Sequence, residues 1–245
     1  MDHILITGAT GGIGQAVVRS LAEQEAKLCL SGRNEAKLQE LISSLPGEGH
    51  YVLPLHLENP ESLEGPLKNA VKAHGRFTGF VHAAGVGDVR PIRLTKTDFV
   101  NRVMKINFSS YLEIVRVLSS KQCKGDYLNI VGVSAIGALI GNSTKTAYCA
   151  SKAAMNAATR CLAKELAPKN IRINTVAPGA TQSDMLSDIL NLPGGDVALA
   201  KITERQFLGV CSPYDIAQGI LFLLNLSSKM ITGHCLPIDG GKLIN

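Results

Sequence analysis

Tryptophan is absent from this chain, and aromatic residues make up only 4% of its 245 positions. So few aromatic rings provide no platform on which successive nucleic-acid bases can stack. The 25 lysines and arginines are scattered and form no long basic run, although the net charge is +5. Nucleic-acid-binding surfaces carry clustered basic residues, so we expect a mildly basic globular protein with no nucleic-acid partner.

Long hydrophobic runs are also absent. The apolar run near the C-terminal end, residues 220–224, is far too short to cross a bilayer. The first ten residues, MDHILITGAT, carry an early acid and lack the long apolar stretch of a signal peptide. We therefore expect a cytoplasmic protein with no membrane partner.

Cysteines are few and far apart. The six thiols are Cys29, Cys123, Cys149, Cys161, Cys211 and Cys235. They form neither a CxxC pair nor a cluster with histidine, so the sequence predicts no metal site. We expect reduced thiols, several of them buried as small hydrophobic residues.

What the sequence does contain is a regular alternation of short apolar runs and helical patterns. Buried strands are expected at residues 3–7, 27–31, 51–57, 79–84, 127–133, 172–177 and 234–239. The alternation predicts an α/β, doubly wound Rossmann fold with a seven-stranded parallel sheet flanked by helices. We expect one domain over residues 1–245, with a weakly periodic segment at 183–209 that covers the substrate.

A glycine-rich turn follows the first expected strand, with the sequence TGATGGIG at residues 7–14. Gly8 permits a tight turn, while Gly12 and Gly14 let the backbone approach a ligand and let the helix pack on the strand. The free N–H groups at the helix start then face an anion. The spacing is TGxxxGxG and not GxGxxG, and it predicts a diphosphate cradle; the alternative is a turn without a ligand.

The end of the second expected strand indicates which dinucleotide would bind. An NAD site usually has an acidic residue there for the ribose 2′-hydroxyl, but this chain has SGRN at residues 31–34. Arg33 can pair with a 2′-phosphate through its planar guanidinium. This residue favours NADP(H) over NAD(H), unless it is an ordinary surface arginine.

Tyr148 and Lys152 lie four residues apart in AYCASKAA, within an expected helix. Residues i and i+4 share a helix face, so both side chains can point into one cleft. We expect the ammonium to lower the tyrosine pKa from its usual value near 10. Such a phenol can give a proton to a carbonyl oxygen as hydride reaches the carbon. YxxxK alone is a weak signal, because many helices contain it by chance.

Two further polar residues strengthen this signal. Ser134 follows the fifth expected strand, where ligands bind in open α/β sheets, and can donate a hydrogen bond to a substrate oxygen. Asn107, in KINFSSYL, can hold a water that relays protons through Lys152. The histidines His3, His50, His74 and His234 have no spacing that suggests a metal.

Together these motifs resemble the short-chain dehydrogenase/reductases over almost the whole chain, most closely the subgroup of 3-oxoacyl-carrier-protein reductases. Asn107, Ser134, Tyr148 and Lys152 fall in the order of that family's catalytic tetrad. The resemblance also implies a homotetramer, or a homodimer, packed through the helices that hold Asn107 and Tyr148. The cofactor-binding residues that it implies are Gly8, Thr10, Gly12, Ile13, Gly14, Arg33, Leu57, Ala84, Gly85, Tyr148, Lys152, Pro178, Gly179, Thr181 and Ser183.

Three positions depart from the family's pattern. HAAG at residues 82–85 replaces NNAG, so a hydrogen-bonding contribution to the sheet must be replaced. His56 stands where the family usually has an adenine-contacting aspartate. Gly11 stands where many NADP-using members carry an arginine, which leaves Arg33 as the residue that supports NADP.

The sequence and the resemblance predict an NADP(H)-dependent oxidoreductase that acts on a small carbonyl or secondary alcohol substrate. A 3-oxoacyl thioester on a carrier protein is one option, and a fatty acid, steroid, sugar or xenobiotic compound is another. The alternatives are an NAD-linked dehydrogenase and a non-catalytic regulator that senses NADP(H). Basic residues that could contact a carrier protein, or be ordinary surface charges, are Arg90, Arg93, Lys201 and Arg205.

Overall fold

The fold is described here from a computed structural model that covers residues 2–183, 186–187, 191 and 194–244. Seven parallel strands form one sheet in the order β3-β2-β1-β4-β5-β6-β7, which confirms the predicted doubly wound fold. The strands are β1 His3–Thr7, β2 Lys27–Ser31, β3 Tyr51–Val52, β4 Phe77–His82, β5 Lys124–Val133, β6 Ile171–Pro178 and β7 Cys235–Ile238.

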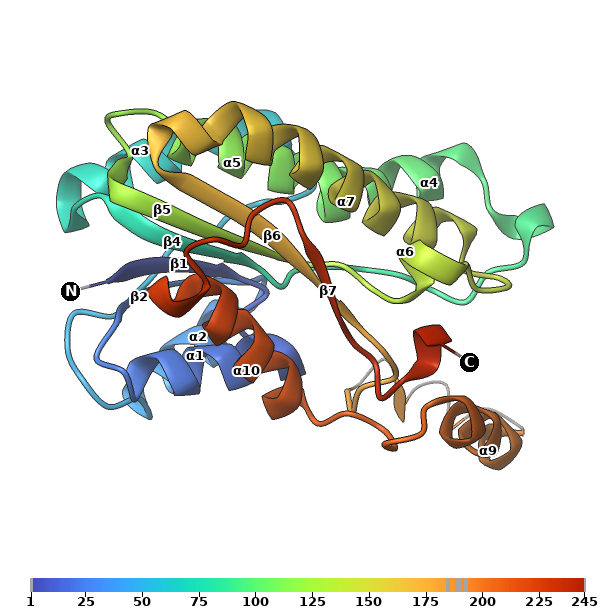
Figure 1. The fold of residues 1–245 in the computed structure, drawn as a ribbon. Coiled ribbons are helices and arrows are strands. Elements are labelled where there is room, and N and C mark those ends of the chain that lie inside the picture. The colour runs from blue at the N-terminus through green and yellow to red at the C-terminus, as the bar shows by residue number, and fades with distance from the viewer. Residues whose placement is uncertain (1, 184–185, 188–190, 192–193, 245) are drawn as a thin grey trace.

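Helices cover both faces of the sheet (Figure 1). The α-helices are α1 Gly12–Ala22, α2 Glu35–Ser43, α3 Glu64–His74, α4 Thr97–Met104, α5 Ser110–Leu118, α6 Gly137–Ile140, α7 Thr146–Leu166, α9 Gly195–Arg205 and α10 Pro213–Leu224. Short turns of other helix types are η1 Pro60–Ser62, η2 Ile92–Leu94, η3 Lys105–Ser109, η4 Ala167–Lys169, η5 Leu226–Ser228 and η6 Lys242–Ile244. Within the described residues, no helix has the length and apolar character needed to span a membrane.

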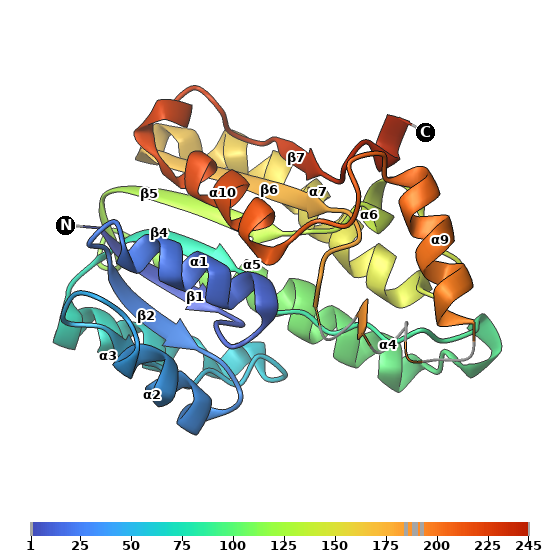
Figure 2. The ribbon, with the colours of Figure 1, turned by 90° about the horizontal axis from the view of Figure 1, so that it is seen from below.

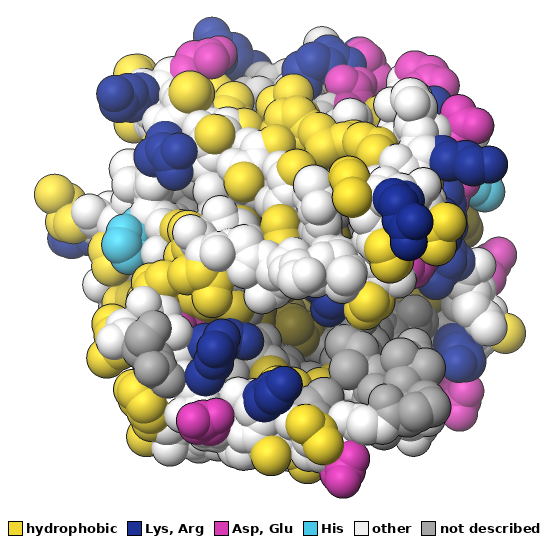
Figure 3. Space-filling view, turned by 90° about the vertical axis from the view of Figure 1, so that its right-hand side faces the viewer, with side chains coloured by type: hydrophobic (Ala, Val, Ile, Leu, Met, Phe, Trp, Pro, Cys, Tyr) yellow, Lys and Arg dark blue, Asp and Glu magenta, His cyan; other side chains and the backbone are white. Residues whose placement is uncertain are grey.

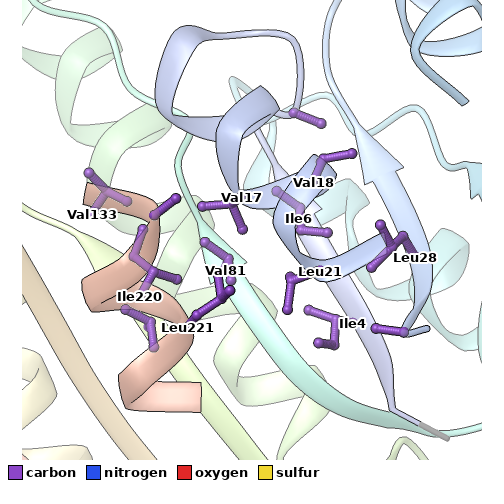
Figure 4. Packing of buried hydrophobic residues seen from close by; sticks show 14 of the residues in the cluster. Ile4, Ile6, Val17, Val18, Leu21, Leu28, Val81, Val133, Ile220 and Leu221 are labelled. Carbon is purple, nitrogen blue, oxygen red and sulfur yellow. The ribbon is translucent and has the colours of Figure 1, made fainter. Parts of the chain in front are cut away.

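Two hydrophobic cores result from the alternation of side chains along the strands. In β1, Ile4 and Ile6 belong to the core under α1, α2 and α10, whereas Leu5 belongs to the core under α3, α5 and α7. Figure 4 shows the first core, where Val17 and Ile220 approach each other from α1 and α10. Burying each such side chain contributes roughly 1.5–3 kcal/mol, so both helix layers hold the sheet firmly.

The third strand is shorter than predicted. We expected a strand over residues 51–57, but β3 contains only Tyr51 and Val52. This strand lies at the edge of the sheet and Pro54 follows closely. A proline lacks the N–H group that a sheet ladder needs, so regular pairing ends and residues 53–57 continue as a loop.

A long segment with a helical pattern is interrupted. The pattern DFVNRVMKINFSSYLEIVRVLSS, residues 98–120, is typical of one helix, but the structure divides the segment into α4 and α5 at η3, which is a π-helical turn. Asn107 lies inside this turn and is fully buried. Single π turns within α-helices occur often at functional sites.

The parallel arrangement brings the predicted site residues to the end of the sheet where the carboxyl ends of the strands lie. The glycine turn follows β1, Ala84 and Gly85 follow β4, and Ser134 follows β5. This is the right-hand end of the sheet in Figures 1 and 2, where α6, α9 and the C-terminal residues also lie.

Candidate active site

The glycine turn has the geometry of an anion cradle. Gly8 has φ +70°, and a Cβ atom there would lie 2.6 Å from the Ala84 backbone nitrogen. A Cβ atom on Gly14 would lie 2.1 Å from the Gly8 carbonyl oxygen. The first turn of a helix has free N–H groups, and at Gly11 no side chain caps the start of α1. The backbone around Gly12, Ile13 and Gly14 therefore fits a diphosphate.

The neighbouring strand end supplies a cation. The Ala9 N–H donates to the Ser31 carbonyl oxygen at 3.1 Å, which ties the glycine turn to β2. Thr10 lies nearby, since a Cβ atom on Gly32 would be 3.4 Å from its Oγ1. Arg33 is exposed and takes part in none of the ion pairs of the described residues. Its guanidinium is therefore available for a phosphate, while Leu57 lies half-buried after β3.

Asn107 connects the loop after β4 with α7. Its Nδ2 donates to the Val86 carbonyl oxygen and to Ser151 Oγ, both at 2.9 Å. Its Oδ1 accepts from the Val86 N–H at 2.8 Å. Both amide hydrogens are thus used, and one acceptor site of Oδ1 remains for the water that we predicted from the sequence.

Lys152 is almost fully buried in the middle of the site, with only 3% of its surface exposed. Its Nζ donates to the Val133 carbonyl oxygen at 2.6 Å. A Cβ atom on Gly85 would lie 3.2 Å from this Nζ and 3.6 Å from Asn107 Oδ1, so these groups converge on the loop after β4. Burial lowers the pKa of Lys152 to about 8, which makes its proton exchangeable near neutral pH.

Tyr148 and Lys152 share one face of α7, as predicted. The Lys152 Nζ lies 5.9 Å from the centre of the Tyr148 ring. The predicted lowering of the Tyr148 pKa, however, is wrong for the protein without its cofactor. Burial, and secondarily Cys149, raises the pKa of Tyr148 to about 12, because removal from water penalises the charged phenolate.

Ser134 lies beside these residues at the end of β5. Its N–H donates to the Val176 carbonyl oxygen at 2.8 Å, and its Oγ donates to the Lys152 carbonyl oxygen at 3.3 Å. The serine is buried, which excludes bulk water from its hydroxyl. The structure thus brings all four residues of the predicted tetrad to one region.

The segment after β6 reaches the glycine turn. The Gly179 N–H donates to the Ile238 carbonyl oxygen at 2.9 Å, which ties Pro178 and Gly179 to β7. Thr181 is buried, and its carbonyl oxygen accepts from Ser183 Oγ at 3.1 Å. A Cβ atom on Gly12 would lie 3.7 Å from the Gln182 carbonyl oxygen. Residues far apart in the chain thus lie close together at the carboxyl end of the sheet.

Two residues that position this site were not predicted. Gly87 packs against Tyr148, since a Cβ atom there would lie 2.4 Å from the ring's Cδ2. Gln206 is fully buried. Its Oε1 accepts from the Ala180 N–H at 2.9 Å, and its Nε2 donates to the Ala180 carbonyl oxygen at 3.0 Å. Gly87, the second glycine of GVGD, could have been recognised in the sequence as a site of close packing. Nothing in the sequence around Gln206 indicates that this glutamine is buried.

His82 replaces the missing asparagine of the family's pattern. Its Nδ1 lies 2.9 Å from Thr7 Oγ1 and so connects β4 with β1. The ring is fully buried, and burial, together with the nearby Lys152 charge, lowers its pKa to about 3. The histidine therefore stays neutral, and its contact with Thr7 joins β4 to β1 where the family's asparagines are absent.

Comparison with known proteins identifies the class. Residues 8–242 match the family model described as enoyl-(acyl carrier protein) reductase. The chain is 34% identical over 242 residues to 3-oxoacyl-[acyl-carrier-protein] reductase FabG of Rickettsia typhi, covering 98% of this chain and 96% of that protein. It is 31% identical over 243 residues to L-xylulose reductase of Caenorhabditis elegans, covering 98% and 94%.

A solved structure supports the same assignment. The short-chain dehydrogenase/reductase (glucose/ribitol dehydrogenase) from Brucella melitensis superposes with a TM-score of 0.90 and 26% identity, covering 98% of this chain and 96% of that one. The chain belongs to the short-chain dehydrogenase/reductase family. It is an oxidoreductase that acts on CH–OH or C=O groups with a nicotinamide dinucleotide.

Proposed function

We propose that this protein is an NADP(H)-dependent oxidoreductase that interconverts a small carbonyl compound and its secondary alcohol. The observation that carries the proposal is the convergence of Tyr148, Lys152 and Asn107 at the strand ends beside the glycine turn. The bound nicotinamide supplies or accepts the hydride.

The protein's own residues would handle the proton. During reduction, the Tyr148 hydroxyl gives its proton to the substrate oxygen, and Ser134 donates a hydrogen bond to the same oxygen. Tyr148 is protonated across the neutral range because burial holds its pKa at about 12. Lys152, whose pKa burial lowers to about 8, is suited to returning a proton to that site. Asn107 holds the loop at Val86 against α7.

The choice of NADP(H) rests on Arg33. The residues of the glycine turn fit a dinucleotide diphosphate, and Arg33 is the cation that would hold a 2′-phosphate. Ala84, Gly85, Thr181 and Ser183 would line the path toward the nicotinamide end. NAD(H) is the alternative, since Gly11 provides no second cation.

The segment 183–209 is proposed to cover the substrate. Its residues 184–185, 188–190 and 192–193 lie outside the described structure, and its described portion includes α9. A 3-oxoacyl thioester is one substrate candidate, because a relative is named for that reaction. A sugar is another, because of the xylulose reductase relative. We also propose that the chain forms a single domain and that the protein is cytoplasmic.

The proposal is tested by following NADPH oxidation with a panel of ketones, 3-oxo esters, thioesters and ketoses. Tyr148→Phe should lower kcat by about 10²-fold or more, because it removes the proton donor and preserves the ring packing. Binding of NADPH to this variant should stay unchanged in a direct titration. Near-normal turnover in Tyr148→Phe with cofactor bound would eliminate the assigned role.

A further inference from the structure

Tyr148 has a second ammonium group near its ring. Lys145 precedes α7 by one residue, and its Nζ lies 6.0 Å from the centre of the Tyr148 ring. This distance matches the 5.9 Å of Lys152 Nζ. Lys145 is half-buried, so the chain places an additional cation at the proposed site of proton transfer and partly removes it from water.

No described carboxylate neutralises this cation. The ion pairs of the described residues involve Lys68, Arg90, Arg102 and Arg116, and Lys145 is not among them. Burial is the main cause that lowers the pKa of Lys145; Cys149 opposes this, and the neighbouring Lys242 adds to it. A partly desolvated ammonium without a counter-ion is costly, and a bound anion would offset that cost.

Lys242 extends the positive charge. It belongs to η6, and burial followed by the charge of Arg205 lowers its pKa, while Asp239 raises it. The Asp239 carboxylate already accepts N–H groups from Gly241 at 3.1 Å and Leu243 at 2.7 Å. Lys242 therefore has one described carboxylate nearby, Asp239, which backbone N–H groups already occupy, and it adds positive charge near Lys145.

The start of α7, α9 and η6 all lie at the carboxyl end of the sheet. The C-terminal residues lie near α6 and α9 in both ribbon views (Figures 1 and 2). Figure 3 shows this end of the molecule, where Lys and Arg side chains lie beside a hollow in the lower half of the view. Lys145, at the start of α7, and Lys242, in η6, thus belong to segments at the same end of the sheet as Tyr148.

We propose that Lys145, assisted by Lys242, binds an anionic group of the substrate, so that the substrate is a carbonyl or alcohol compound with a carboxylate near the reacting carbon. This inference rests on the proposed function and narrows its substrate class. It favours a free oxo acid or hydroxy acid over a thioester, because the thioester group that replaces the carboxylate carries no charge.

The test compares NADPH-dependent reduction of acetoacetate with that of its neutral methyl ester and its N-acetylcysteamine thioester. The wild type should prefer the acid. In Lys145→Gln, the acid-to-ester ratio of kcat/KM should fall about tenfold or more, mainly through KM, as expected for loss of a charge-assisted hydrogen bond. Lys145→Arg should restore most of the ratio. Lys164→Gln, which changes an exposed lysine on the same helix, should keep it.

Several outcomes would overturn the inference. A wild-type preference for the ester or thioester would do so while leaving the oxidoreductase proposal intact. An equal fall in kcat for acid and ester in Lys145→Gln would assign Lys145 to the chemistry at Tyr148 and not to substrate recognition. Absence of NADPH oxidation with all three substrates and with the ketone and ketose panel would count against the proposed function itself.

A binding measurement keeps the inference testable without turnover. Malonate, a dicarboxylate that cannot be reduced here, is titrated into the wild type and into Lys145→Gln, each saturated with NADP⁺. The wild type should bind malonate about tenfold more tightly than the variant. Equal malonate affinities would exclude Lys145 as the anion-binding residue.

Discussion

At Tyr148, burial is the main cause that raises the pKa of the phenol, and Cys149 adds to it. The pKa of the phenol is raised to about 12, whereas that of the buried Lys152 is lowered to about 8. Within the working pH range the tyrosine therefore stays protonated and the lysine titrates. Under the proposed mechanism, Tyr148 would contact the substrate, and Lys152 would be the group that limits proton supply.

The pH dependence of reduction should report this lysine. Desolvation favours the neutral amine, so Lys152 loses its proton as the pH rises through about 8, and kcat/KM for ketone reduction should fall in the same range. A pH–rate profile from 6 to 10 measures the fall. Lys152→Arg keeps the positive charge and should move any fall to higher pH. A level wild-type profile between pH 7 and 10 would contradict this assignment.

At the scale of elements, much of the site follows from patterns that are local in sequence. The apolar runs predicted the strands. Because Ser134 and TGATGGIG each follow one of these strands, the sequence also predicted that both lie at the carboxyl ends of the strands. The face shared by Tyr148 and Lys152 followed from helix periodicity alone. These features depend on residues that are close together in the sequence, so they can be predicted from the sequence.

Other features depend on contacts that no local pattern encodes. The π turn at Asn107 is stabilised by bonds to Val86 and Ser151, which lie 21 and 44 residues away in the chain. The buried amide of Gln206 and the reversed pKa shift of Tyr148 likewise depend on the packing around them. The sequence shows residue types and spacing, but it does not show how far each group is removed from water.

The loop after β4 should be sensitive to a single methyl group at Gly87. An added Cβ atom would lie 2.4 Å from the Tyr148 ring, so Gly87→Ala must displace the ring or the loop. We expect kcat to fall about tenfold or more, since small misplacements of reacting groups are costly.

A matched substitution separates this effect from a general loss of stability. Gly65 in α3 has no atom within 4 Å of an added Cβ, so Gly65→Ala should keep full activity. It should also be neutral or stabilising by about 0.5–1 kcal/mol, as alanine suits helices better than glycine. Activity assays and thermal unfolding of both variants measure the two effects. Full activity in Gly87→Ala would show that the contact does not position Tyr148.

For the whole molecule, the expected homotetramer or homodimer should use the outer face of α5 and α7. A groove on this face is lined by Leu112 and Val115 of α5 and by Leu162 and Leu166 of α7. Leu112 is 38% exposed despite its apolar side chain. Apolar surface of this kind is often covered by a second copy of the chain.

This expectation is tested by light scattering coupled to size-exclusion chromatography. Leu112→Asp should place a charge in the interface and reduce the particle mass to that of a smaller assembly or a monomer. Lys72→Glu, on exposed α3 surface outside the groove, should keep the wild-type mass. A wild-type monomer, or an unchanged mass in Leu112→Asp, would rule out assembly through this face.

The central claim is that the chain binds NADP(H) and uses it at Tyr148, and isothermal titration with NADPH and NADH tests it most directly. We predict clear preference for NADPH, and loss of that preference in Arg33→Ala, because a guanidinium–phosphate pair contributes roughly 1.5–3 kcal/mol, or about tenfold to a hundredfold in affinity. Equal or tighter binding of NADH would contradict the NADP(H) assignment, and binding of neither dinucleotide would contradict the account of the site as a whole.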